Sequence, residues 1–365
     1  MLAHLSLLNF RNLEPLKWGP GPGSHLLLGG NGAGKTSVLE AVYALATTRS
    51  FRAARLEDCV RHGSDGFQLE GEVDTDHRAT LELRWIEGKR IRLLNGRAAP
   101  LAEHLAVLPI VAWTHAEAEV LTGAPKARRR FLDRGVVGLR PPALDLLNRY
   151  MEALRQKREL LLQGARQGTR QGTRDSSDLE VWNEILATTA AEVIRLRHAY
   201  VERLREVLTG VLAESTLDLP PIEVRYKPSP ATGLEGPLVI AAALERAADR
   251  ERLRQVPLLG PQRDELEILW AGHDIRRVAS AGERKALSLL LVAAHGRVLE
   301  SAGRLPLYLL DDADAELAPP THSAVWGVFR NAPQIIATSN RPQVWLTLEV
   351  GKAWEMEKGR MKVLA

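Results

Sequence analysis

The N-terminal part of the chain alternates apolar strands with one amphipathic helix. Residues 2–10 alternate loosely between apolar and polar positions, which is typical of a strand with one buried face. Residues 26–28 form a short apolar run that predicts a buried strand. Apolar side chains then recur at helical spacing over residues 38–45, so we expect a helix directly after this strand.

The stretch from residue 68 to residue 113 predicts an antiparallel sheet. Strands are expected over 68–73, 79–86 and 91–94, and an Asn-Gly pair follows the third as a hairpin turn signal. A further apolar stretch, residues 105–113, is interpreted as another strand.

Two long amphipathic helices are predicted in the middle of the chain. Apolar side chains recur at helical spacing over residues 143–162 and again over 179–212. Polar residues 164–177 join them and contain a tandem QGTR repeat at 167–174, so we expect a mobile linker. The pattern predicts an antiparallel helical hairpin with arms of roughly 30 to 50 Å.

The C-terminal third returns to alternating strands and helices. The expected elements are a strand at 220–226, a helix at 238–254, a strand at 266–270, a helix at 280–299, and strands at 305–310 and 334–337. The predicted fold class is therefore α/β with mixed sheets, in which one domain, 1–113 plus 256–365, is split by a helical insertion, 114–255.

Length and composition fit a two-domain globular protein. The chain has 365 residues, of which 45% are hydrophobic, enough for a sizeable core. No apolar run approaches the length of a membrane span, and no charged leader precedes an apolar run at the N-terminus, so we expect a cytoplasmic location. Cys59 is the only cysteine, which excludes an internal disulfide and a cysteine zinc site and agrees with a reducing compartment.

Positive charge is concentrated in one segment. The whole chain carries a net charge of +4, whereas residues 126–174 hold 13 Lys/Arg against 4 Asp/Glu, a local charge of +9. Such a surface is either a solvated helix face or a binding surface for a polyanion, and the local excess favours the second.

A glycine-rich loop joins the strand at 26–28 to its helix and matches the pattern G-x-x-x-x-G-K-[ST]. In this pattern backbone N–H groups hold phosphate oxygens, Lys35 reaches the β- and γ-phosphates and acts in catalysis, and Thr36 ligates magnesium. A turn that merely joins strand and helix is the alternative, but pattern and context agree on a nucleotide site. The expected contact residues are Gly29, Asn31, Gly32, Gly34, Lys35, Thr36 and Ser37.

Two acids follow the strand predicted at 305–310. A phosphate-binding loop by itself hydrolyses nothing, because the magnesium needs a second protein ligand and the attacking water needs a base. We expect Asp311 on the metal side, acting through water, and Asp312 as the general base. The alternative is that the two acids cap the next helix or lie in a solvated turn.

The sequence Ser-Ala-Gly-Glu at 280–283 opens the helix predicted at 280–299. Ser280 and Glu283 fit a capping box, which is a purely local role. About 30 residues before the two acids, the same sequence is similar to the signature motif of ABC-type ATPases. There a serine, a glycine and the helix N-terminus bind the γ-phosphate held by the opposite subunit, which assigns Ser280 and Gly282 to the nucleotide.

Six motifs in order carry a resemblance to a known family. They are NFRNL at 9–13, GGNGAGKTSVLEAV at 29–42, GAPKARRRFLD at 123–133, LLGPQRDEL at 258–266, SAGERKALSL at 280–289 and LLDDADAEL at 309–317. On these motifs, which span nearly the whole chain, the sequence resembles the RecF family of bacterial recombination mediators, in the ABC/SMC class. The phosphate-binding loop is common to many families, whereas R-R-F-L-D and G-P-x-R-D are specific to this one.

The resemblance implies an ABC-type ATPase head that carries an inserted helical hairpin. It also implies a weak, DNA-stimulated ATPase that uses ATP and Mg²⁺, forms a homodimer on ATP binding, and binds double-stranded, gapped or junction DNA. In the family this activity works with RecR, and with RecO in the wider pathway, to direct RecA loading. Arg128, Arg129 and Arg130 would then contact DNA phosphates, and Arg11 would approach the nucleotide.

Three sites depart from the family pattern. The family usually has His where Gln262 stands, Pro-Glu-Asp at 115–117, and Asp where Ala318 stands. That Asp normally lies across the dimer interface. Ala318 is therefore expected to alter the coupling between the two sites and the hydrolysis rate, while nucleotide binding remains.

Three other protein classes share part of this pattern. An ABC transporter subunit has the same motifs but normally lacks a basic helical hairpin, and a chromosome-organising ATPase needs much longer arms. A small-molecule kinase would need an acceptor site, which no motif here resembles. Stimulation of ATP hydrolysis by DNA would separate a RecF-like function from transport.

Overall fold

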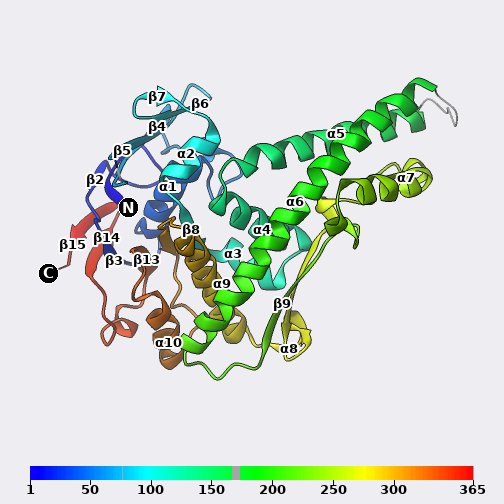
Figure 1. The fold of residues 1–365 in the computed structure, drawn as a ribbon. Helices are drawn as coiled ribbons and strands as arrows, with labels where there is room; N and C mark the ends of the chain where they lie inside the picture. The colour runs from blue at the N-terminus through cyan, green and yellow to red at the C-terminus, as the bar shows by residue number, and fades with distance from the viewer. Residues whose placement is uncertain (76, 167–172, 365) are drawn as a thin grey trace. The chain divides into compact units, whose positions relative to one another are not determined.

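The structure is a computed structural model that describes residues 1–75, 77–166 and 173–364. It contains two compact units (Figure 1). The first comprises Met1–Gly123, Glu206–Pro220 and Ile275–Ala365, and the second comprises Ala124–Arg205 and Pro221–Asp274.

These bounds differ from the expected domains 1–113 plus 256–365 and 114–255. Residues 256–274 belong to the second unit, because the strand β10 (Glu265–Trp270) pairs with β9 (Ile222–Lys227).

An antiparallel sheet forms one layer of the first unit. Its strand order is β2-β1-β4-β5-β6-β7, so the sheet expected from the N-terminal patterns is confirmed. The strands are β1 (Leu2–Leu8), β2 (Leu16–Trp18), β4 (Gly66–Val73), β5 (Ala79–Ile86), β6 (Lys89–Leu94) and β7 (Arg97–Ala98).

A mainly parallel sheet forms the other layer, in the order β15-β14-β3-β13-β12-β8. Only β15 runs antiparallel, to β14. The strands are β3 (Gly23–Leu28), β8 (Ile110–Trp113), β12 (Leu307–Leu310), β13 (Gln334–Ser339), β14 (Lys352–Glu357) and β15 (Arg360–Val363).

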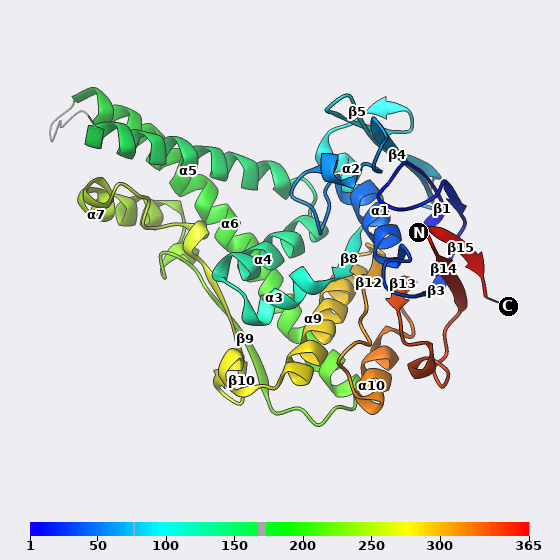
Figure 2. The same cartoon turned by 180° about the vertical axis from the view of Figure 1, so that it is seen from behind.

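The helix α1 (Lys35–Thr47) supplies the core between the two sheets (Figures 1 and 2). Its buried side chains share one hydrophobic cluster with residues of β1, β4, β5, β12 and β13. Gln334 joins the layers directly, because its fully buried side chain exchanges two 2.8 Å hydrogen bonds with the backbone of Leu2. The core therefore fixes the carboxyl ends of the parallel strands relative to the start of α1.

Five other helices belong to the first unit, and one of them corrects a prediction. They are α2 (Leu101–Val107), α3 (His115–Thr122), α8 (Ile275–Val278), α9 (Ala281–Ser301) and α10 (Pro319–Phe329). The prediction of a strand over 105–113 is wrong for residues 105–107, which form the end of α2. Pro109 disfavours helix at the residue before it, so the apolar run changes from helix to strand there.

The second unit is mainly helical. Its elements are α4 (Pro125–Leu139), α5 (Ala143–Arg166), the larger part of α6 (Thr173–Glu214), α7 (Pro237–Arg254), β9, β10 and β11 (His273–Asp274). A core of Tyr150, Leu186, Ile194 and Leu244 joins α5, α6 and α7.

The predicted helical pair is confirmed, with changes in its extent. The 42 residues of α6 correspond to about 63 Å at the usual helical rise, longer than the expected arm. The centre of the expected linker, residues 167–172 with most of the QGTR repeat, lies outside the described residues. None of the described helices combines the length and apolarity of a membrane-crossing segment.

Candidate nucleotide-binding site

The glycine-rich loop between β3 and α1 is held close to its neighbours. A side chain at Gly29 would place its Cβ 2.4 Å from the carbonyl oxygen of Met356, and one at Gly34 would lie 2.8 Å from Leu13 Cδ2. Gly34 also has a φ of 109°, which non-glycine residues rarely adopt. The loop therefore needs glycine at these two positions of the motif.

Lys35 points into the concave side of this loop. Its ammonium donates hydrogen bonds to the carbonyl oxygens of Gly29 at 2.8 Å and Gly30 at 3.0 Å, and the side chain is buried. The N–H groups at the start of α1 lie at the same end of the helix, where an anion is favoured. This geometry can hold a phosphate group.

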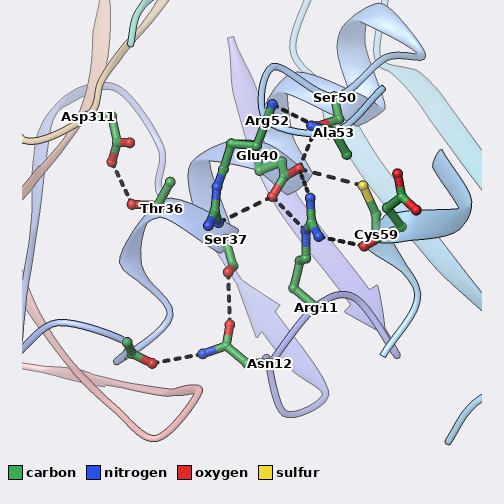
Figure 3. Close-up of polar contacts among 12 residues, drawn as sticks. Arg11, Asn12, Thr36, Ser37, Glu40, Ser50, Arg52, Ala53, Cys59 and Asp311 are labelled. Atoms are coloured by element: carbon green, nitrogen blue, oxygen red, sulfur yellow. Dashed lines mark hydrogen bonds and ion pairs between the residues drawn. The ribbon is translucent and has the colours of Figure 1, made fainter. Parts of the chain in front are cut away.

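Asp311 lies beside Thr36 although the two residues are far apart in the sequence. Thr36 Oγ1 donates a hydrogen bond to Asp311 Oδ1 at 2.8 Å (Figure 3). Thr338 Oγ1 donates to the same oxygen at 2.8 Å. Burial raises the pKa of Asp311, and the two hydroxyl hydrogen bonds oppose that shift. Parallel strands place these side chains together at the carboxyl edge of the sheet.

The oxygen atoms of Thr36 and Asp311 fit a magnesium ion. Mg²⁺ prefers oxygen ligands, keeps several waters, and is usually bound by one or two protein groups together with substrate phosphates. Among the described residues no cluster of three or more His, Cys, Asp or Glu side chains could hold a metal ion. The site therefore suits a metal that arrives with a phosphate ligand.

Asp312 differs from its neighbour in conformation and contacts. Its φ is 47°, its backbone N–H donates to Thr338 Oγ1 at 2.8 Å, and its side chain is half-buried. In the described part of the chain its carboxylate takes part in no ion pair. A carboxylate that is not neutralised by a cation can accept a proton.

The capping box at the start of α9 is confirmed. Ser280 Oγ accepts from the Glu283 N–H at 3.3 Å, and Glu283 Oε2 accepts from the Ser280 N–H at 2.7 Å. Ser280 is exposed, and no hydrogen bond among the described residues joins Ser280 or Gly282 to the phosphate-binding loop. Within one chain, the structure does not bring these two predicted residues to that loop.

Lys285 links α9 to the acidic loop. Its ammonium donates to the carbonyl oxygens of Asp312, at 3.1 Å, and Ala315, and lies 4.7 Å from the centre of the Trp113 ring. Trp113 in turn donates through Nε1 to Ser288 of α9 at 2.8 Å. The sequence motif did not predict this connection.

Two more polar residues were missed from the sequence. Asn12 donates to the Gly32 carbonyl and accepts from Ser37 Oγ, both at 2.8 Å, and so braces both ends of the loop (Figure 3). Thr338 contacts both acids from β13. The only sequence signal for Thr338 is its position as a polar residue at the end of an apolar strand.

Arg11 forms an ion pair that the sequence did not predict. Its guanidinium binds the fully buried carboxylate of Glu40 through two hydrogen bonds of 2.9 and 2.6 Å, and also donates to the Asp58 carbonyl (Figure 3). A buried carboxylate requires such a partner. Since this contact occupies the guanidinium, we leave Arg11 out of the proposed nucleotide contacts.

The three consecutive arginines of α4 assigned to DNA also differ from one another. Arg128 is buried in an ion pair with Glu265, and Arg129 donates to the Asp264 carbonyl at 3.1 Å. Arg130 is exposed. A guanidinium held in a buried ion pair cannot also contact DNA, so Arg128 is removed from the proposed DNA contacts and Arg130 is kept.

The departures from the family pattern have local roles. Gln262 donates to the Leu259 carbonyl at 2.8 Å and accepts from the Tyr150 hydroxyl. Residues 115–117 form the first turn of α3. Ala318 is the N-cap of α10, where its side chain supplies no capping hydrogen bond.

Comparison with known proteins agrees with this geometry. The model of the RecF/RecN/SMC N-terminal domain family matches residues 1–361. The chain is 32% identical to the DNA replication and repair protein RecF of Acidothermus cellulolyticus, with 99% of each chain covered. It is 32% identical to the protein of the same name from Myxococcus xanthus, with 93% of this chain and 90% of that one covered.

Solved structures show the same fold. The recombination mediator protein RecF-ATPrS of the RecFOR pathway matches with a TM-score of 0.87 and 24% identity, covering 100% of this chain and 98% of that one. An SmcHead bound to a domain of ScpA matches with a TM-score of 0.55 and 16% identity, covering 100% and 96%. The chain therefore has the α/β fold of an ABC-type ATPase head, and it belongs to the RecF/RecN/SMC N-terminal domain family and, within it, to the RecF proteins.

Proposed function

We propose that this chain is an ATP-dependent DNA-binding protein of recombinational repair and a weak ATPase that DNA stimulates. It binds gapped or double-stranded DNA as an ATP-driven homodimer and, with RecR and RecO, aids the loading of RecA. The names of its relatives support the repair function, and the phosphate-binding loop supports ATP as the cofactor.

The observation that carries the proposal is the 2.8 Å contact between Thr36 and Asp311. It brings the phosphate-binding loop and the two acids into one site. In this site Lys35 holds the phosphates, and Thr36 and Asp311 hold magnesium, which neutralises phosphate charge when bound. Asp312 accepts a proton from the attacking water.

The α9 N-terminus supports assembly into a dimer. Ser280 and Gly282 are not linked to the loop of their own chain by a described hydrogen bond, although a helix N-terminus favours an anion. We assign them to the γ-phosphate held by a second copy. ATP then joins the two chains, because each phosphate group is bound from both sides.

The test measures mass and DNA binding in parallel. Light scattering and binding to a fluorescent gapped duplex are recorded with ATP and magnesium, with ADP and magnesium, and without nucleotide. We expect a dimer with high DNA affinity only with ATP. Lys35→Ala should bind ATP at least thirtyfold more weakly, since a hydrogen bond to a charged group is worth about 2 kcal/mol, and should remain monomeric. Equal mass and DNA affinity in all three conditions would refute the proposal.

A further inference from the structure

The helix α7 carries a row of three exposed arginines in the second unit. Arg246, Arg250 and Arg254 are spaced four residues apart, so they lie along one side of the helix. No ion pair or hydrogen bond involves any of the three within the described part of the chain. We call these three residues the α7 row.

The acidic residues of α7 form no described ion pair with the row. Asp249 pairs with Arg252 at 3.0 Å, and Glu251 pairs with Lys157 at 2.6 Å. No ion pair in the described part of the chain therefore neutralises the α7 row. Like charges four residues apart destabilise a helix by about 0.2 to 0.5 kcal/mol per pair, and no described contact within the chain offsets this cost.

The buried side of α7 anchors the helix in its unit. Ile240, Leu244 and Ala247 are buried, and Glu251 forms a buried ion pair with Lys157 of α5 at 2.6 Å. Figure 2 shows α7 beside α5. The α7 row is thus presented on an anchored helix, which limits the entropy lost when it binds a ligand.

The usual structural roles of surface arginines do not explain the row. Arg252 and Arg254 lie in the last turn, where a positive charge favours the helix dipole. This accounts for Arg254 but not for Arg246 and Arg250, which lie two turns and one turn earlier, respectively.

The spacing of the arginines in the α7 row fits a nucleic acid backbone. Eight residues of helix span about 12 Å, and one DNA strand presents a phosphate roughly every 3.4 Å along its axis. A row of this length, placed along one strand, is long enough for each of its three guanidinium groups to meet a phosphate. Arginine also matches phosphate oxygens in a planar, two-pronged geometry.

We propose that the α7 row binds the phosphate backbone of DNA. This inference rests on the proposed function and adds a DNA contact outside the basic segment 126–174. The contact is independent of base sequence, because phosphates carry no sequence information.

The test compares two triple variants of the full chain with equal loss of charge. The row variant is Arg246→Gln, Arg250→Gln, Arg254→Gln. The control is Arg195→Gln, Arg225→Gln, Arg252→Gln, which removes three exposed arginines of the same unit that are each already paired with a carboxylate. Affinity for a gapped duplex is measured with ATP and magnesium across a range of salt concentrations.

The row variant should flatten the slope of log affinity against log salt by up to about 2.7, and lose on the order of 100-fold in affinity at 0.15 M salt. The control should change the slope by less than about one. Replacing the row with three lysines should restore the slope. ATP affinity should match the parent in all variants, and thermal melting should show that each variant is folded.

Three results would count against the inference. A row variant with the parent's slope would overturn the inference alone. A parent that binds no DNA in any nucleotide state would overturn the proposed function as well. Fluorescent polyglutamate that binds the parent but not the row variant, with DNA affinity unchanged, would mean that the α7 row recognises an acidic protein surface instead.

Discussion

Asp311 and Asp312 are neighbours in the sequence, but they make different contacts. Asp311 accepts two hydroxyl hydrogen bonds, and its partial burial raises its pKa while these hydrogen bonds oppose the shift. Asp312 is half-buried and has a left-handed backbone conformation with a φ of 47°. Different surroundings allow two carboxylates to take different roles, which is consistent with the proposed metal ligand and proton acceptor.

Asp312→Asn should separate binding from hydrolysis. Asn tolerates the left-handed conformation and keeps the size of the side chain, but it cannot accept the proton. We expect unchanged ATP affinity and a loss of about 100-fold or more in hydrolysis rate. Steady-state hydrolysis and nucleotide titration measure the two effects. Glu316→Gln, which neutralises an exposed acid of the same loop, is the control, and parental turnover in Asp312→Asn would remove it from this role.

Local sequence motifs predicted some residues of the candidate nucleotide-binding site. The residues that they missed reach the site through long-range contacts. The phosphate-binding pattern predicted Lys35 and Thr36 because the loop is continuous in sequence. Asn12 and Thr338 reach the site from other elements, so no spacing in the sequence connects them to it. Arg11 was assigned to the nucleotide from the family resemblance, and its partner, Glu40, could not be recognised as a buried acid from the sequence alone.

Whole elements were predictable where their hydrophobic period was long. The pattern identified α5, α6 and α9, whereas the short apolar run at 105–113 fits both helix and strand and was partly wrong. The sequence did not predict the contacts of Lys285, which join α9 to the acidic loop. They depend on how two elements pack, which the sequence pattern does not contain.

Lys285→Met should uncouple α9 from the acidic loop. The substitution keeps an unbranched side chain but removes the ammonium that holds the Asp312 and Ala315 carbonyl groups. We expect KM for ATP to stay within about threefold and kcat to fall about tenfold, since hydrogen bonds to charged groups are worth about 1.5 to 3 kcal/mol. Lys285→Arg should retain most of kcat. Unchanged kcat in Lys285→Met would show that the contact does not position Asp312.

Ala318→Asp should stabilise α10. Position 318 is the N-cap of this helix, it is exposed, and its alanine makes no capping hydrogen bond. An aspartate there can accept from an N–H of the first turn, a gain of about 1 kcal/mol. Urea denaturation measures the gain. Ala318→Leu, which cannot cap, should give none, and equal midpoints for the two variants would contradict the assigned cap.

At the scale of the whole molecule, the residues assigned to the nucleotide fall into two groups within one chain. The loop and the acids meet within the chain, whereas the start of α9 is exposed and has no described hydrogen bond to that loop. The sequence predicted two domains and assigned residues 256–274 to the first of them. In the structure these residues belong to the second unit, because β10 pairs with β9.

Ser280→Arg should distinguish a local role of Ser280 from a role between subunits. Loss of the cap alone would cost about 1 kcal/mol of stability and leave ATP-driven assembly intact. If Ser280 meets the γ-phosphate of a second copy, the bulk of arginine should block closure of the dimer while each monomer still binds ATP through Lys35.

Light scattering with ATP and magnesium decides between these roles. Ser280→Ala is the matched control, because it loses the same cap without adding bulk, so both variants should lose similar stability while only Ser280→Arg stays monomeric. Nucleotide titration verifies that both bind ATP. A Ser280→Arg protein that binds ATP and dimerises at the parent's concentration would exclude the role between subunits and leave Ser280 as a helix cap.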